Sequence, residues 1–131
     1  MKYFYYGEVI PQNQRKALNE KVLYLIAGGS PEDSGITPED IRAVDLSRFG
    51  VIHLCDWPAD PAGRQDVEVV RGGRAYCGEG VVDLKGILKA LPENVCSLEL
   101  PNLAEIEARG RAGHAARCLE TAKAFFAANG L

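Results

Sequence analysis

Polar residues that can bind metal ions stand inside or directly after two apolar runs of this sequence. His53 lies within the run 50–55, and Asp56 follows that run. Glu99 lies within a second run, residues 95–100. Imidazole nitrogen and carboxylate oxygen are donors that divalent metal ions accept. His53 and Glu99 are therefore candidate metal ligands, provided that the fold brings the two runs together.

A second group of polar residues lies between these runs. Arg74 precedes Glu79, which Gly78 and Gly80 flank. A guanidinium group suits the anionic or oxygen-rich part of a substrate, so Arg74, Glu79 and Asp56 are candidate substrate-binding residues. Structural explanations also exist: His53 as a hydrogen-bonded core residue, Glu99 as a helix N-cap or ion-pair partner, Arg74 as a solvated loop cation, and Gly78-Glu79-Gly80 as a simple turn. No catalytic acid or base can be assigned.

The hydrophobic pattern predicts the elements that must position these residues. Apolar runs bounded by glycine or proline indicate strands over 2–10, 22–27, 50–55 and 95–100. Helices are expected over 12–20, 37–44, 83–91 and 103–128, and a long loop over 57–80. This alternation is typical of parallel βαβ units, in which ligands gather at the carboxyl ends of the strands.

The helix patterns also predict which side chains are buried. The third expected helix should pack through Leu84, Ile87 and Leu88. The last should pack through Leu119, Ala122, Phe125 and Phe126, with His114 on a surface helix.

Three motifs carry a resemblance to a known family. They are Ile52-His53-Leu54-Cys55-Asp56, Arg74 with Gly78-Glu79-Gly80 and Asp83-Leu84, and Ser97-Leu98-Glu99-Leu100-Pro101-Asn102. Together they resemble the closing part of the sugar phosphate isomerase/epimerase family, which has the xylose isomerase-like barrel. Residues 28–32 and 40–42 are similar to the segment just upstream, so the resemblance covers roughly residues 22–128.

The resemblance implies a role for each matching residue. His53 and Glu99 would ligate one divalent metal ion (Mn, Mg, Co or Zn), Arg74 would contact a sugar or sugar phosphate, and Glu79 would shape the pocket. In such enzymes the metal polarises a carbonyl and a hydroxyl of the sugar while an acid–base pair moves a proton.

The length of the chain limits how far the resemblance reaches. A complete barrel takes about 250 residues, and this chain has 131. We expect a single α/β domain, a partial (half) TIM-type barrel of about four parallel βα units that self-association as a homodimer completes. Within it, residues 1–21 form a divergent N-terminal strand and helix, and residues 22–131 the barrel-closing segment.

Two departures bear on activity. Where the family carries an aspartate and then a histidine, this sequence has Glu20 and Leu23, and the strands with the family's first glutamate and its acid–base residue are absent. Glu8 is one residue that could imitate that glutamate. The two functional readings are a truncated relative without efficient catalysis as a single chain, and a metal-dependent sugar isomerase or epimerase whose site is completed in a homodimer.

Charge and composition exclude other classes of protein. The net charge is −3 and no basic stripe occurs, which argues against nucleic-acid binding and against an endonuclease like some relatives of the family. No run reaches the roughly 20 apolar residues of a membrane span. The first residues lack the pattern of a signal peptide, and the four cysteines form no CxxC pair. We expect a cytoplasmic protein with four reduced structural thiols.

Overall fold

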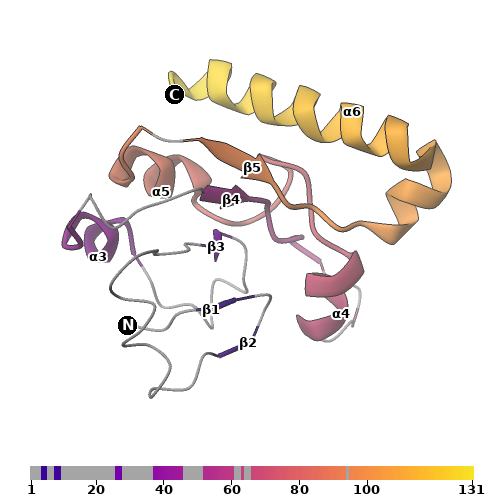
Figure 1. Ribbon diagram of the computed structural model, residues 1–131, viewed down its shortest axis with the longest axis horizontal. Coiled ribbons are helices and arrows are strands. Elements are labelled where there is room, and N and C mark those ends of the chain that lie inside the picture. Colours follow the sequence, from indigo (N-terminus) through magenta and orange to yellow (C-terminus); the bar gives the residue numbers. More distant parts are fainter. Residues whose placement is uncertain are drawn as a thin grey trace.

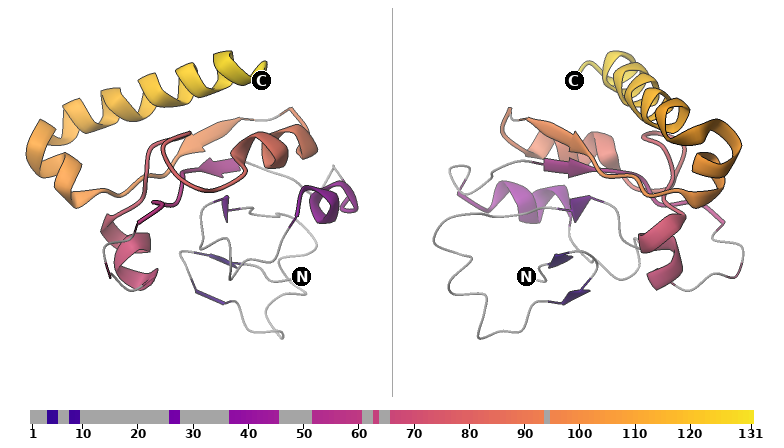
Figure 2. Two further views of the ribbon diagram at one scale, coloured as in Figure 1. Left: turned by 180° about the vertical axis from the view of Figure 1, so that it is seen from behind. Right: turned by 45° about the vertical axis from the view of Figure 1, so that its right-hand side comes forward.

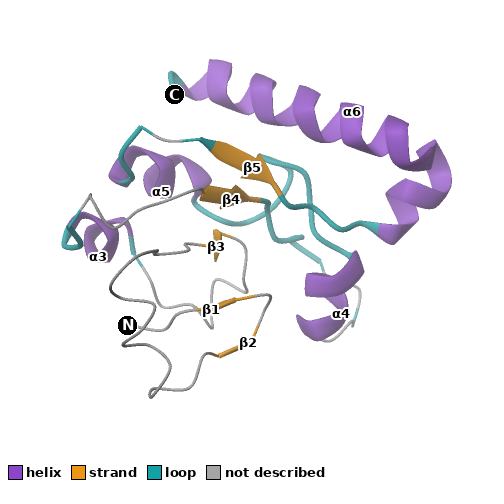
Figure 3. Ribbon diagram, viewed as in Figure 1, coloured by secondary structure: helices purple, strands orange, loops and turns teal. Residues whose placement is uncertain are grey.

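The computed structural model describes residues 4–5, 8–9, 26–27, 37–45, 52–60, 63, 66–93 and 95–131 (Figure 1). Figure 3 shows the same chain coloured by helix, strand and loop. In chain order the elements are β1 (Phe4–Tyr5), β2 (Glu8–Val9), β3 (Ile26–Ala27), α3 (Pro38–Arg42), β4 (Ile52–Leu54), α4 (Asp66–Gly72), α5 (Leu84–Ala90), β5 (Cys96–Leu98) and α6 (Leu103–Asn129). None of the helices in these described ranges has both the length and the apolar content needed to cross a membrane.

Three strands form a parallel sheet in the order β3-β4-β5. The register places Ile26 beside His53, and His53 beside Ser97. The pairing continues past the end of β5, because the Glu99 backbone N–H donates to the Leu54 carbonyl at 3.1 Å. Parallel pairing of strands that are joined through helices agrees with the alternation in the sequence.

The N-terminal segment differs from the single strand expected over 2–10. β1 and β2 pair antiparallel, with Phe4 opposite Val9 and Tyr5 opposite Glu8. Because antiparallel partners run in opposite directions, the chain reverses between them, and one continuous strand is wrong. The helix expected over 12–20 and residues 22–25 of the second expected strand lie outside the described residues.

Local capping explains where α3 and α5 begin. The Asp40 carboxylate accepts from the Thr37 backbone N–H at 2.8 Å, and the Thr37 hydroxyl accepts from the Asp40 N–H at 3.3 Å. This is a capping box, with Pro38 in the first helical turn. At α5 the Asp83 carboxylate accepts from the Gly86 N–H at 2.9 Å. Both helix starts agree with the sequence.

The helices pack on one face of β4. Ile52 belongs to a buried apolar cluster with Ile41 of α3 and Ala90 of α5. Leu54 belongs to a second cluster with Leu84 of α5 and Ala122 of α6. Figure 1 and both views of Figure 2 show α6 running alongside the sheet next to β5. Since side chains alternate along a strand, the residue between Ile52 and Leu54 faces the other side of the sheet.

Two expectations about helices are wrong. Residues 66–72 of the expected loop form α4. Leu119, expected on the packed side of α6, is 49% exposed, whereas Cys118, Thr121 and Ala122 are buried. The helix bends at Gly110, which has a φ of 73° and a ψ of 163°. Beyond that bend the covered strip of α6 runs along Cys118 and Thr121, and Leu119 lies outside it.

Candidate functional site

His53 and Glu99 lie together at the carboxyl ends of two adjacent parallel strands. The register places His53 beside Ser97, and Glu99 follows two residues later on the same face of the sheet. His53 Nδ1 lies 3.1 Å from Glu99 Oε2. Both side chains point away from the face that carries Ile52 and Leu54. The structure thus brings the two expected metal ligands into contact.

The geometry of this pair fits two positions around a divalent ion. Two ligands about 2.1 Å from one ion stand roughly 3.0 to 3.4 Å apart, depending on the coordination geometry. The observed separation of 3.1 Å lies in that range, and it equally suits a direct ion pair. The two side chains are 31% and 29% exposed. The Nδ1 atom of His53 is itself buried, so an ion would reach it only after a shift of the imidazole ring or of the Glu99 carboxylate.

The described residues alone do not provide a complete metal site. No group of three or more histidine, cysteine, aspartate or glutamate side chains converges within the described ranges. A protein site usually supplies three or four ligands to zinc. Further ligands would have to come from solvent, substrate, another copy of the chain or residues outside the description.

Arg74, expected to contact substrate, lies inside the protein and is 2% exposed. Its Nε donates to the Val70 carbonyl at 3.1 Å, and its Nη1 donates to the Glu99 carbonyl at 3.1 Å and to the Cys55 thiol at 3.3 Å. The guanidinium group therefore lies behind the backbone of Glu99 and contacts protein atoms.

Asp56 is also buried, at 1% exposed. Its carboxylate accepts four backbone N–H groups, at distances between 2.8 and 3.1 Å. The donors are Trp57, Gly78, Gly80 and Val82. A Cβ at Gly80 would stand only 2.1 Å from the Trp57 carbonyl oxygen and 2.4 Å from Asp56 Oδ1, so the loop closes around this carboxylate at a glycine.

Glu79, the third expected substrate residue, points toward α6. Its Oε1 lies 2.7 Å from Arg117 Nη2, and the Arg117 guanidinium carbon lies 5.6 Å from the centroid of the Tyr76 ring. Both partners of the ion pair are more than 40% exposed, which makes it a weak surface interaction.

The sequence did not reveal a series of hydrogen-bonded side chains around His114 and Tyr76. His114, expected on the surface, is 7% exposed. Its Nε2 donates to the Leu100 carbonyl at 2.8 Å, and its Nδ1 lies 2.8 Å from the Tyr76 hydroxyl. The Tyr76 hydroxyl also lies 3.1 Å from Glu105, which Arg109 contacts in turn. The only sequence signal was the spacing of His114 and Cys118 by one helical turn.

Burial and hydrogen bonding shift the pKa values of Tyr76 and Glu105. Burial, and then the hydrogen bond to Glu105, raises the pKa of Tyr76 to about 12. The Arg109 hydrogen bond, followed by the Tyr76 hydroxyl, lowers the pKa of Glu105. The tyrosine therefore stays protonated and the glutamate ionised at neutral pH.

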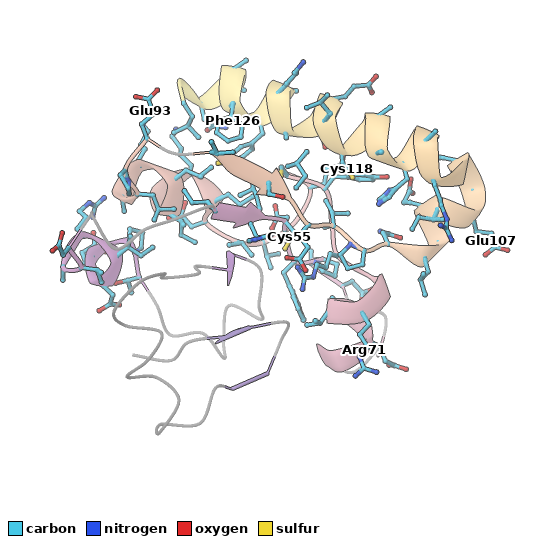
Figure 4. The ribbon with its side chains drawn as sticks, in the orientation of Figure 1. Cys55, Arg71, Glu93, Glu107, Cys118 and Phe126 are labelled. Carbon is cyan, nitrogen blue, oxygen red and sulfur yellow. The ribbon has the colours of Figure 1, made fainter. Side chains whose placement is uncertain are left out.

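All four cysteines are free thiols, as the sequence predicts. Burial raises the pKa of Cys55, Cys96 and Cys118, and that of Cys77 to about 12. Figure 4 shows Cys55 at the end of β4 and Cys118 on α6. Thiols with raised pKa values are poor nucleophiles, so a structural role fits them.

Three residues that bear on the barrel resemblance cannot be placed at the site. Glu20 and Leu23 lie outside the described residues, and only the backbone of Glu8 is described, in β2.

Comparison with known proteins gives no match: no protein-family model, no curated protein and no solved structure is similar to this chain.

Proposed function

We propose that this chain is a half-barrel relative of the sugar phosphate isomerases and epimerases, and that His53 and Glu99 hold one divalent metal ion. The observation that carries the proposal is the 3.1 Å contact between an imidazole nitrogen and a carboxylate at the carboxyl ends of two adjacent parallel strands. This edge is where α/β proteins place their ligands. The motif resemblance adds the class of ligand, a sugar or sugar phosphate.

The chain's own residues would do three things at this site. His53 supplies an imidazole nitrogen from β4, and Glu99 supplies a carboxylate oxygen from the end of β5. The parallel pairing of β4 with β5 fixes their separation. A bound divalent ion would polarise a carbonyl or hydroxyl oxygen of the ligand.

A single chain is not expected to catalyse isomerisation efficiently. Within the described ranges, no third histidine, cysteine, aspartate or glutamate joins His53 and Glu99 in a group that could hold a metal ion. We therefore propose metal and ligand binding without efficient turnover as the property of one chain. The free thiols suit a reducing compartment, so we place this activity in the cytoplasm.

The second candidate function is an isomerase or epimerase whose site is completed in a homodimer. One observation favours it: the His53 and Glu99 side chains are each about 30% exposed, so another chain could lie against this part of the sheet. Measuring isomerase activity at high and low protein concentration distinguishes the two functions. Only the second predicts activity that appears when the dimer forms.

Isothermal titration calorimetry with Mn²⁺, Co²⁺ and Zn²⁺ tests the metal site. The wild-type chain should bind one ion, and His53→Ala and Glu99→Gln should each weaken the affinity at least about tenfold. Glu79→Gln is the matched control, since it also removes one carboxylate charge but pairs with Arg117. Equal affinities for all four proteins would overturn the proposal.

A further inference from the structure

A short segment joins the ends of the two strands that carry the site. Beyond β4, Asp56 and Ala75 exchange backbone hydrogen bonds at 2.9 and 3.1 Å. Beyond β5, the Arg74 N–H donates to the Pro101 carbonyl at 3.1 Å, and Asn102 Nδ2 donates to the Arg74 carbonyl at 2.9 Å. Residues 73–75 therefore cross the carboxyl ends of both strands and hold them in place.

The Arg74 side chain extends this connection into the interior. Its guanidinium group reaches the Cys55 thiol after β4, the Glu99 carbonyl after β5 and the Val70 carbonyl in α4. A planar guanidinium can make these three contacts together because its N–H groups are fixed in a fork. One side chain thus contacts α4, the residue that follows β4 and the backbone of Glu99, a proposed metal ligand.

The charge of Arg74 has no ion-pair partner in the described part of the chain. Ion pairs there join Arg42, Arg109 and Arg117 to carboxylates, and His53 lies beside Glu99. None of these contacts includes Arg74. A cation that is 2% exposed without a carboxylate beside it carries a desolvation cost. Stability alone therefore gives little reason for an arginine at this position.

We propose that Arg74 is a positioning residue, which sets the place of the Glu99 carboxylate against His53 through the Glu99 backbone and does not touch the ligand. The expected effect of Arg74 on metal affinity rests on the proposed function. The contact between His53 and Glu99 does not, because it exists in the metal-free protein. The carbonyl that Arg74 binds belongs to the same residue whose carboxylate lies 3.1 Å from His53.

Nuclear magnetic resonance of the metal-free protein at one fixed pH tests the positioning role directly. The reference is the change in the His53 ring ¹⁵N shifts on going from wild type to Glu99→Gln. Arg74→Met should move these shifts toward the Glu99→Gln values. Arg74→Lys should shift them in the same direction, because lysine keeps the positive charge but cannot donate to the three acceptors together. Unchanged His53 shifts in both Arg74 variants would overturn the inference, whether or not Glu99→Gln moves them.

Metal affinity then tests the consequence. Partners that orient a metal ligand typically contribute 10–100-fold to affinity, so Arg74→Met and Arg74→Lys should each weaken binding by about tenfold. Ile41→Ala, which truncates a side chain that is 3% exposed in the cluster around α3, is the control for lost stability alone and should leave affinity unchanged. Affinity that falls in Ile41→Ala as much as in the Arg74 variants would contradict a specific positioning role.

The two proposals fail separately. If the wild type binds no metal while the Arg74 variants still displace the His53 resonances, the proposed function fails and the positioning role stands. If the wild type binds metal and the Arg74 variants bind it equally well with unchanged resonances, the positioning role fails and the metal site stands.

Discussion

Four polar residues that the sequence places near the strand ends differ in how deeply the structure buries them, and their roles differ accordingly. His53 and Glu99 are about 30% exposed and contact each other. Asp56 and Arg74 are at most 2% exposed and bind backbone groups. A buried charge is tolerated when the protein supplies its hydrogen bonds, which the loop around Asp56 does with four N–H groups.

We expect Asp56→Asn to destabilise the fold strongly. Asparagine offers one acceptor oxygen, and its NH₂ group would face backbone N–H donors. Leaving such donors buried and unsatisfied should cost about 2–4 kcal/mol of unfolding free energy. Urea denaturation measures this loss, with the exposed Glu93→Gln as the control for removing one carboxylate. A loss below about 0.5 kcal/mol, the usual limit for surface changes, would contradict the role given to Asp56.

Tyr76 should make folding stability depend on alkaline pH. Its folded pKa of about 12 lies above the ordinary value of 10.0, so its contribution is fully present below pH 10 and is lost as pH rises toward 12. Tyr76→Phe cannot ionise there. The stability advantage of wild type over Tyr76→Phe should therefore shrink between pH 10 and 12. Chemical denaturation at several pH values measures this difference, and a constant difference would disprove the burial of the hydroxyl.

At the scale of elements, α6 depends on a bend at Gly110. A φ of 73° with a ψ of 163° is accessible to glycine and strained for every other residue. Nothing lies within 4 Å of a Cβ built there, so a substitution meets strain rather than a clash. The bend lets Glu105 before it and His114 after it both reach Tyr76.

Gly110→Ala should therefore lower the unfolding free energy by about 1–3 kcal/mol. The sign of the effect is informative, because alanine in a continuous helix would stabilise by about 0.5–1 kcal/mol relative to glycine. Thermal and urea denaturation decide between the two. A stabilised variant would mean that α6 is unbroken.

The sequence predicts most elements because they carry local signals. Thr37 and Asp83 mark helix starts through their side-chain caps, and apolar runs mark β4 and β5. α4 was missed because the glycines and prolines of 57–80 dominate the local pattern, although Val69 inside it is fully buried. The error at Leu119 has another cause: apolar spacing places Leu119 on the same side of α6 as Ala122, but it does not show how wide the covered strip of the helix is.

The site was only partly predictable for similar reasons. Parallel strands in register bring His53 and Glu99 together, and the sequence supplies both strands. The burial of Arg74 and the four donors around Asp56 depend on how residues 73–82 fold back over the strand ends. Those contacts join residues far apart in the chain, so no local pattern reveals them.

At the scale of the whole molecule, the described sheet ends at β5. Val95, just before this strand, is 68% exposed. A strand at the edge of a sheet tends to pair with another chain, and an exposed apolar residue next to it favours such pairing. We therefore expect a homodimer, in agreement with the half-barrel proposal.

Light scattering coupled to size-exclusion chromatography should give twice the chain mass of 14.2 kDa. Val95→Lys should shift the protein toward monomer, because a charge at a strand edge opposes pairing. Glu93→Lys is the control, since it adds a lysine two residues away at a position that is already polar and exposed. A wild-type monomer at high concentration would contradict self-association.

The central claim is that His53 and Glu99 bind one metal ion together. A crystal grown with Co²⁺ tests it most directly through an anomalous difference map recorded at the cobalt edge. We predict one peak per chain at about 2.0–2.2 Å from both His53 Nδ1 and a Glu99 carboxylate oxygen. A map with no peak between these two side chains, at a cobalt concentration that saturates any binding seen by calorimetry, would contradict the claim.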